Sequence, residues 1–400
     1  MANATIDHML SLTVFIAALL IFIGLFSQTI QTGLAYQRHS AISTKTSDLL
    51  DTILLNPGIP MTWGQSDTAP EAFGVQDPEF MQYKQNSYST MRLCSSEAQV
   101  YFQSKDAYYS NVSAGYGGYL LTPTAKTVNY TEASRLLGLN GTYGFQFTLT
   151  PTINFTIEKV STGSPLKLSV DASGMGFPLA NTTLSYSLVL VNQEIAAYPY
   201  YNVTNGRTAT DQAGHKQLEF AGVNGETVSY ALVVYAYLDG LKGMGYYVHV
   251  PPTSTKSVVP LVDSFQNRNV TLAHGDSVGT PGAQPYPEVS YNASFLIRTE
   301  EYTLRTVVLA DACGSVGGAA GQNYASVIVP DNEGILIVTY KDTADHYGLV
   351  LMPWGLGSLG FPVTLGGDPA GQSWVTTDIR QVTIGGIAYQ AKLQLWSLQG

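Results

Sequence analysis

The residues best placed to do chemistry are Gly275-Asp-Ser277-Val-Gly279, which match the Gly-x-Ser-x-Gly pattern of serine hydrolases. In those enzymes a strand-to-helix turn exposes the serine so that a histidine can take its proton. Here Thr280-Pro-Gly follows, and a helix cannot begin in that composition. His274 and Asp276 are too close in sequence to be spaced members of a triad. We therefore predict no catalysis at Ser277 and no enzyme activity.

Two other motifs also lack the context that their chemistry requires. Gly355-Leu-Gly-Ser-Leu-Gly360 fits Gly-x-Gly-x-x-Gly but has no βαβ unit around it, so we predict a coil near a module interface. No histidine pair has a metal-ligand spacing. A weak calcium or metal site at Asp342, Asp345 and His346 is the alternative to a solvated hairpin turn, which we favour, and we expect no cofactor. Asp331-Asn-Glu-Gly predicts a second hairpin turn, between Val329 and Ile335.

Asparagine is the residue type that best indicates the compartment. Nine of the 17 asparagines lie in Asn-x-Ser/Thr, the acceptor sequence for N-glycans on surface loops of secreted proteins. A Thr-rich β protein that accumulates such sequences by chance is the alternative. Besides Asn3, the predicted glycosylation sites are Asn111, Asn129, Asn140, Asn154, Asn181, Asn202, Asn269 and Asn292.

Charge and cysteine content agree with an extracytoplasmic protein. Only 12% of the residues are charged, about half the usual share, and glycans or burial in an assembly would supply solubility instead. The net charge of -10 argues against a nucleic-acid partner. Cys94 and Cys313 are interpreted as one disulfide that closes a long loop, with two separate buried thiols as the alternative.

All of these residues except Asn3 follow a long helix that the sequence predicts at the N-terminus. Residues 9–36 contain no charged side chain, and residues 9–26 are almost entirely apolar, long enough to span a bilayer as a helix. The helical pattern continues to Asn56-Pro-Gly, where Pro57 and Gly58 should end it. A cleaved signal peptide is the alternative, but the leader has no Lys or Arg. The residues assigned to an assembly helix are Asp7, Leu12, Phe15, Leu19, Leu20, Phe22, Leu25 and Phe26.

Beyond the helix, the periodicity predicts mainly β structure. Asp77-Pro is expected to open a second helix that reaches towards Asn111, within a connector at residues 57–144. From Phe145 the apolar residues alternate with polar ones, which is typical of half-buried strands in an antiparallel sandwich. We predict an N-terminal helix at residues 1–56, a sandwich at residues 145–274 and a second β module at residues 288–400.

The segment Asp48-Leu-Leu-Asp-Thr-Ile-Leu-Leu-Asn-Pro-Gly-Ile-Pro-Met-Thr-Trp-Gly resembles archaeal type IV pilin-like and archaellin-like surface proteins. In that group a hydrophobic N-terminal helix runs into a Pro-Gly-x-Pro-x-x-Trp turn before a β-rich head. The resemblance covers about the first 110 residues. It implies that apolar helices bundle in a filament core, where Asp7 would neutralise a neighbouring positive N-terminus.

A second resemblance concerns Gly176-Phe-Pro-Leu-Ala-Asn-Thr-Thr and Thr210-Asp-Gln-Ala-Gly, which are similar to the turns of prokaryotic immunoglobulin-like surface modules. It covers about residues 145 to 255 and implies a spacer or an adhesive head.

The function expected from these features is that of a structural subunit of an archaeal extracellular filament, a homopolymer with its helices in the core and glycosylated β heads outside. The expected partners are copies of the chain itself and the membrane during or after export. The alternative is a monomeric membrane-anchored adhesin or carbohydrate-binding protein that recognises glycans or other cells, with tyrosines such as Tyr198-Pro-Tyr-Tyr201 stacking on sugars. Residues 347–367, uncharged and apolar, are expected to form an exposed loop that packs on a neighbouring subunit or on the other β module.

Overall fold

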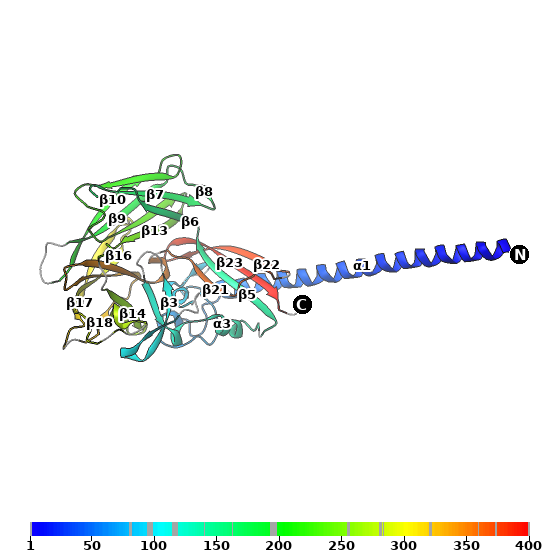
Figure 1. The fold of residues 1–400 in the computed structure, drawn as a ribbon, viewed down its shortest axis with the longest axis horizontal. Coiled ribbons are helices and arrows are strands. Elements are labelled where there is room, and N and C mark those ends of the chain that lie inside the picture. Colours follow the sequence, from blue (N-terminus) through cyan, green and yellow to red (C-terminus); the bar gives the residue numbers. More distant parts are fainter. Residues whose placement is uncertain are drawn as a thin grey trace.

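The computed structural model consists of one long helix and a β-rich head from which the helix projects (Figure 1). It describes residues 2–79, 82–93, 99–113, 119–139, 141–161, 163–192, 198–253, 257–279, 282, 284–319, 322–358, 360–372 and 374–398. The predicted fold class, a long apolar N-terminal helix followed by a mainly β ectodomain, is confirmed.

Helix α1 (Ala2–Leu54) is continuous and ends where the sequence predicts. Pro57 lacks the N–H needed to extend the helix, and Gly58 adopts a φ of +81° that favours glycine. The side chain of Asn56 accepts a hydrogen bond from the Gly58 N–H at 2.9 Å. A Cβ on Gly58 would lie 2.7 Å from the carbonyl oxygen of Ala72, so this turn requires glycine.

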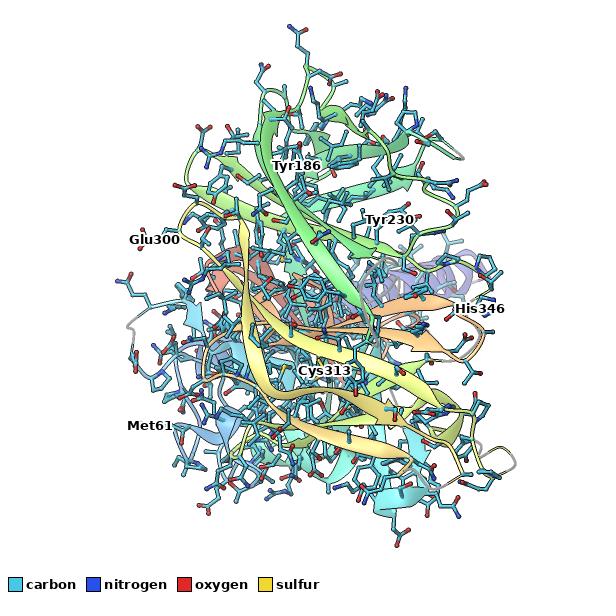
Figure 2. The ribbon with its side chains drawn as sticks, turned by 90° about the vertical axis from the view of Figure 1, so that its left-hand side faces the viewer. Met61, Tyr186, Tyr230, Glu300, Cys313 and His346 are labelled. Atoms are coloured by element: carbon cyan, nitrogen blue, oxygen red, sulfur yellow. The ribbon has the colours of Figure 1, made fainter. Side chains whose placement is uncertain are left out.

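The described residues from 153 to 249 form a β-sandwich with its own hydrophobic core. In β7 the buried Leu166, Leu168 and Val170 alternate with more exposed residues, as the period of two predicts. Figure 2 looks at the side of the head opposite the helix and shows Tyr186 and Tyr230 of the sandwich in its upper part. One sheet has the order β10 (Tyr200–Ala209), β9 (Thr183–Asn192), β12 (Tyr230–Leu238), β13 (Leu241–His249); the other is β11 (His215–Phe220), β7 (Leu166–Gly174), β6 (Ile153–Lys159), with β8 (Phe177–Pro178) beside β7.

Outside the sandwich, a five-stranded sheet, here called the base sheet, lies against the C-terminal end of α1. Its central strand comes from the C-terminal part of the chain and pairs on one side with a strand that precedes the sandwich. Its order is β1 (Lys84–Gln85), β22 (Thr376–Ile384), β23 (Ile387–Ser397), β5 (Tyr143–Pro151), β21 (Val363–Gly366).

Two further sheets complete the head and share the largest hydrophobic core with the base sheet. Most strands in them are antiparallel, whereas β14 and β4 are parallel. The six-stranded sheet is β18 (Tyr324–Ile328), β15 (Asn269–His274), β14 (Val258–Ser264), β4 (Tyr119–Pro123), β3 (Ala107–Ser113), β2 (Gln99–Phe102); the four-stranded sheet is β17 (Leu304–Val316), β16 (Val289–Arg298), β19 (Gly334–Asp342), β20 (Tyr347–Trp354). Short helices connect them: η1 (Trp63–Gln65), α2 (Ser87–Met91), η2 (Gln103–Lys105), η3 (Thr124–Lys126), α3 (Tyr130–Leu136), η4 (Gly275–Ser277) and η5 (Leu356–Ser358).

The strand pairing divides the chain differently from the predicted modules. The predicted sandwich of residues 145–274 begins in β5, which belongs to the base sheet, and ends in β14 and β15, which belong to the six-stranded sheet. The predicted second module of residues 288–400 shares sheets with residues of the predicted connector. The sandwich is therefore inserted into a larger body built from both sides of the sequence, because β-sheet hydrogen bonds join segments that periodicity alone cannot pair.

The predicted second helix from Asp77 is wrong. Residues 77–79 form a turn, with the Asp77 side chain accepting from the Glu79 N–H at 3.0 Å, and the strand β1 follows. The helix begins later, at Ser87, where Asn86 caps it by accepting from the N–H groups of Tyr88 and Ser89. The Asx turn competed with the helix start that Asp77-Pro suggested.

Two further predictions, an exposed loop and a hairpin turn, also differ from the structure. Residues 347–354 are not an exposed loop but strand β20, buried from Gly348 to Trp354. The expected packing on the other β module is present, since Ser229 at the edge of the sandwich donates to the Tyr347 carbonyl oxygen at 2.7 Å. The predicted hairpin at Asp331 is wrong, because β18 and β19 belong to different sheets.

Candidate functional site: the exposed apolar helix

The N-terminal half of α1 exposes apolar side chains on all of its faces. Met9 is 69% exposed and Leu19, the most covered of the predicted assembly residues, is still 46% exposed. Phe22 and Phe26 stack on each other with ring centroids 6.3 Å apart. Asp7 lies in the first turns, and its side chain is outside the described part. The remaining predicted assembly residues are all exposed: Leu12, Phe15, Leu20 and Leu25.

This segment has the length and composition to cross a membrane. Its 18 residues from Met9 extend about 27 Å as a helix, close to the roughly 30 Å of a bilayer's hydrocarbon core. The described residues contain one helix of this kind, with none of its most apolar window buried within the chain. Signal sequences near an N-terminus share these properties, so the observation identifies an apolar segment that needs a covering environment.

Between the apolar segment and the head, residues 27–41 form a second exposed part of α1, here called the stalk. The stalk is about 22 Å long. Phe26, Ile30 and Leu34 follow one another at intervals of four residues and are 59%, 47% and 52% exposed. This spacing places them on one face of the helix, so an apolar stripe continues beyond the segment that a bilayer would cover.

The C-terminal end of α1 is fixed to the base sheet. Leu50, Ile53 and Leu54 are buried, at the i, i+3, i+4 spacing of a core-facing stripe, and Ile42 is buried two turns earlier. The buried hydroxyls of Thr46 and Thr376 lie 2.5 Å apart, which links the helix directly to β22. The helix and the head are therefore one continuous unit at this point.

A charged cluster reinforces the same junction. Arg380 of β22 donates to the Ser47 hydroxyl at 3.0 Å and forms ion pairs with Asp51, at 3.5 Å, and with Asp378. Burial acts to raise the pKa of Asp378, but hydrogen bonds led by that from Arg380 outweigh it and lower this pKa. At the edge of the junction, Lys45 lies 4.4 Å above the centre of the Tyr143 ring.

Below the helix end, one buried arginine holds the connecting turns. Arg92 is completely buried and donates to four backbone carbonyls, those of Trp63, Ser66, Thr68 and Lys126. Burial lowers the pKa of Arg92 to about 10, which still leaves it charged at neutral pH. We call this arrangement the Arg92 clamp. Nothing in the residue pattern around Arg92 predicted that its side chain would be buried and bonded to four carbonyls.

The serine motif has no catalytic geometry. Ser277 is buried, and its hydroxyl donates to the carbonyl oxygen of His274 at 2.6 Å. The His274 ring accepts from the Asp276 N–H through Nδ1 and stacks on Tyr286. The histidine thus stabilises a turn at η4, and the serine hydroxyl is bonded to the backbone of that turn.

The predicted turn at Asp342 is present between β19 and β20. Asp342 accepts from the backbone of His346 and, at 3.0 Å, from its Nδ1, while Asp345 pairs with Lys341. Among the residues that the structure describes, no three His, Cys, Asp or Glu side chains are grouped as metal ligands. Residues 355–358 lie in and beside the short helix η5, which packs on α2, and Gly360 lies against the sandwich residue Met244. The predicted position at an interface is found, but the segment forms a 3₁₀ turn and not only coil.

The predicted glycan acceptors differ in exposure. Asn292 on β16 is only 9% exposed, and the side-chain amide of Asn269 on β15 donates to Asp263 at 3.1 Å. Neither side chain therefore lies free in a surface loop, as a glycan acceptor would. Asn140 lies outside the described residues, as does the side chain of Asn111 on β3. The exposed acceptors are Asn129, Asn154, Asn181 and Asn202.

The cysteine and tyrosine predictions have mixed outcomes. Cys313 is exposed on β17, in the middle of the face seen in Figure 2, and Cys94 lies outside the described residues, so their pairing stays a prediction. Tyr198 and Tyr200 are 41% and 45% exposed, whereas Tyr201 is buried and donates to the Thr306 hydroxyl at 3.4 Å. Tyr201 therefore belongs to the packing between the sandwich and the four-stranded sheet.

No family model and no curated protein sequence matches this chain. Among solved structures, trypsin-activated alpha-2-macroglobulin from Escherichia coli gives a TM-score of 0.21 at 12% identity, over 58% of this chain and 18% of that one. The D0-D1 domain of intimin gives 0.21 at 14%, over 55% and 98%. Two fibronectin type-III domains of chicken tenascin give 0.17 at 9%, over 52% and 99%. This chain spans less than a fifth of the macroglobulin, and scores this low carry no argument about function.

Proposed function

We propose that this chain is a structural subunit of an archaeal surface filament of the type IV pilus kind, held together by its N-terminal helices and displaying its β heads outside. The observation that carries the proposal is the exposed apolar segment of residues 9–26, joined without interruption to a helix end that is fixed to the head. An all-round apolar helix requires burial in lipid or among other helices.

The stalk favours helix bundling over a single anchor. If residues 9–26 crossed a bilayer as a lone helix, Ile30 would lie among the headgroups, and Leu34, about 12 Å beyond Phe26, would remain in water. In a bundle of copies, the same stripe would pack against neighbouring helices. A Cβ added to Gly24 or to Gly33 would meet no atom within 4 Å, so both glycines leave room for close approach of a second helix.

A shearing experiment tests the proposal. Surface appendages are sheared from cells and pelleted, and the chain is quantified by mass spectrometry there and in the membrane fraction. We expect the wild type in the sheared filaments. Leu34→Arg should remove the chain from filaments yet leave it in membranes, because only the contact between copies is lost. Leu20→Arg should remove it from both fractions.

The matched control is Thr32→Arg, which adds the same charge about 160° around the helix from Leu34. Thr32 is exposed and bonds only within its own helix, to the Gln28 carbonyl oxygen. The Thr32→Arg variant should assemble into filaments as the wild type does. Recovery of the wild type in membranes alone, with Leu34→Arg indistinguishable from it, would mean that the chain is a monomeric anchored protein.

A further inference from the structure

A pocket of about 280 Å³ lies in the head where five segments distant in sequence meet. η1 supplies Gln65, α2 supplies Tyr88 and the end of β20 supplies Trp354. The turn between β14 and β15 supplies Arg268, and the segment after β18 supplies Asp331. None of these residues takes part in the exposed helix or in its junction with the base sheet, so the pocket is separate from the assembly site.

The inner wall of the pocket is aromatic. Trp354 stacks on Phe265 with ring centroids 5.9 Å apart and an interplanar angle of 24°. Tyr88 meets Trp354 edge-on, at 6.3 Å and 68°. All three rings are buried, between 2% and 8% exposed, so they form a fixed surface with only a small accessible part. Such a wall gives a ligand a rigid floor, and the polar groups at the mouth must supply most of the binding contacts.

The mouth of the pocket is polar. Gln266 and Asp331 are exposed, and Arg268 and Gln65 are half-buried. Among the described residues, Arg268 and Asp331 form no ion pair with each other or with any third side chain. Their opposite charges therefore remain available at one opening.

The backbone fixes Arg268 in this place. It adopts a φ of +54°, an unusual conformation for a residue with a long side chain. Its N–H donates to the Phe265 carbonyl oxygen at 3.2 Å, and its own carbonyl accepts from Val329 at 2.9 Å. These bonds tie the β14–β15 turn to the segment that carries Asp331. The position of the Arg268 side chain at the mouth is therefore fixed by the backbone of the turn.

The geometry points to a saccharide site: we propose that this pocket binds one neutral sugar ring of a glycan. Guanidinium, carboxylate and carboxamide groups present adjacent donors and acceptors that match neighbouring hydroxyls. The small accessible part of the aromatic wall closes the bottom of the pocket beneath the ring. The volume is at the lower end for ligand pockets, which fits one ring and not a longer chain. A strongly charged ligand is disfavoured because Arg268 and Asp331 balance each other.

The test uses the full chain, solubilised in a detergent without a sugar headgroup. Saturation-transfer NMR is recorded with the methyl glycosides of mannose, galactose, glucose and N-acetylglucosamine, and with glucuronate as the charged comparator. We expect saturable transfer to at least one neutral glycoside. Asp331→Asn and Arg268→Asn should each weaken it at least tenfold; asparagine tolerates the positive φ at residue 268.

The control is Asp345→Asn, which also lies at a positive φ, of 61°, but in the turn between β19 and β20 outside the pocket. It should bind as the wild type does. If Arg268→Asn unfolds, Gln266→Ala at the exposed rim replaces it, with an expected threefold or greater weakening. Transfer to no neutral glycoside, to glucuronate alone, or equally to all variants would overturn the proposal. Filament assembly is unaffected by these changes, so the two proposals fail independently.

Discussion

At the scale of single residues, the Arg92 clamp shows how one buried charge can organise a loop region. Its guanidinium satisfies four carbonyls and lies 5.2 Å from the Trp63 ring and 5.3 Å from the Phe265 ring. Nearby, Asp67 accepts from the Ser264 hydroxyl at 2.6 Å, from the Phe265 N–H and from Lys126. Together these residues join the turn after α1 to the six-stranded sheet.

Replacing Arg92 by lysine should destabilise the head by about 2–4 kcal/mol. A lysine ammonium has three donors and no planar fork, so buried carbonyls would be left unsatisfied. Urea unfolding of the solubilised chain measures the loss. Arg135→Lys on α3, where the arginine side chain is 63% exposed, is the control and should change stability by less than about 0.5 kcal/mol. Equal effects of the two variants would contradict the role given to Arg92.

Asp67 predicts a pH dependence of stability. Burial acts to raise the pKa of Asp67, but the hydrogen bonds from Ser264, Lys126 and Phe265 outweigh it and lower the pKa from its usual value. A pKa lowered by folding stabilises the head above the unfolded value of about 3.9, and this stabilisation is lost as the pH falls through the folded pKa. The stability difference between wild type and Asp67→Asn should therefore be constant from pH 7 to 5 and shrink below about pH 4. A difference that grows on acidification would contradict this.

At the scale of elements, periodicity predicted those segments that have one buried face. The strands β5, β6 and β7 alternate and were found where expected, as was the end of α1. The strand-like segments at β9, β12 and β16 are also strands, although β12 and β16 are buried on both faces. Other strands gave no such signal: β14 contains Pro260, and β20 is buried on both sides and so resembles any apolar segment. The exposed apolar segment was also predictable, whereas the pocket at Trp354 was not, because five segments distant in sequence build it.

The junction of α1 with the base sheet should depend on its buried leucine. Leu50→Ala removes a completely buried side chain and should cost about 2–5 kcal/mol in unfolding free energy. Leu55→Ala is the matched control, because Leu55 is 43% exposed just beyond the helix end, and it should cost well under half as much. Thermal unfolding followed by circular dichroism compares the two. Similar losses would mean that the helix end is not held by this contact.

At the scale of the whole molecule, the sandwich is an insertion in a body closed by β23. This strand lies between β22 and β5 and supplies Leu393 and Leu395 to the largest core. The sandwich has a separate hydrophobic core. Local sequence patterns identified many of these strands but could not show which would pair. The paired strands β5 and β23, for example, are separated in the sequence by most of the residues of the head.

A chain ending at Gly386 should therefore lose the body but keep the sandwich. Without β23, β22 and β5 have no partner between them, and the docking surface for α1 is incomplete. Limited proteolysis should degrade everything except a fragment near residues 153–249. The control ends at Ser397 and retains all of β23, so it should resist proteolysis as the full chain does. Resistance of the shorter chain would show that the body folds without its central strand.

The position of β23 also orders the folding of the chain. Synthesis presents α1 first, whereas the surface that fixes its orientation forms only after residues 376–397 have been made. Until then no complete docking surface holds the helix. Formation of the last strand joins the helix and the head into one rigid unit. In the filament proposed above, a prematurely terminated chain would lack this rigid junction and would not be incorporated.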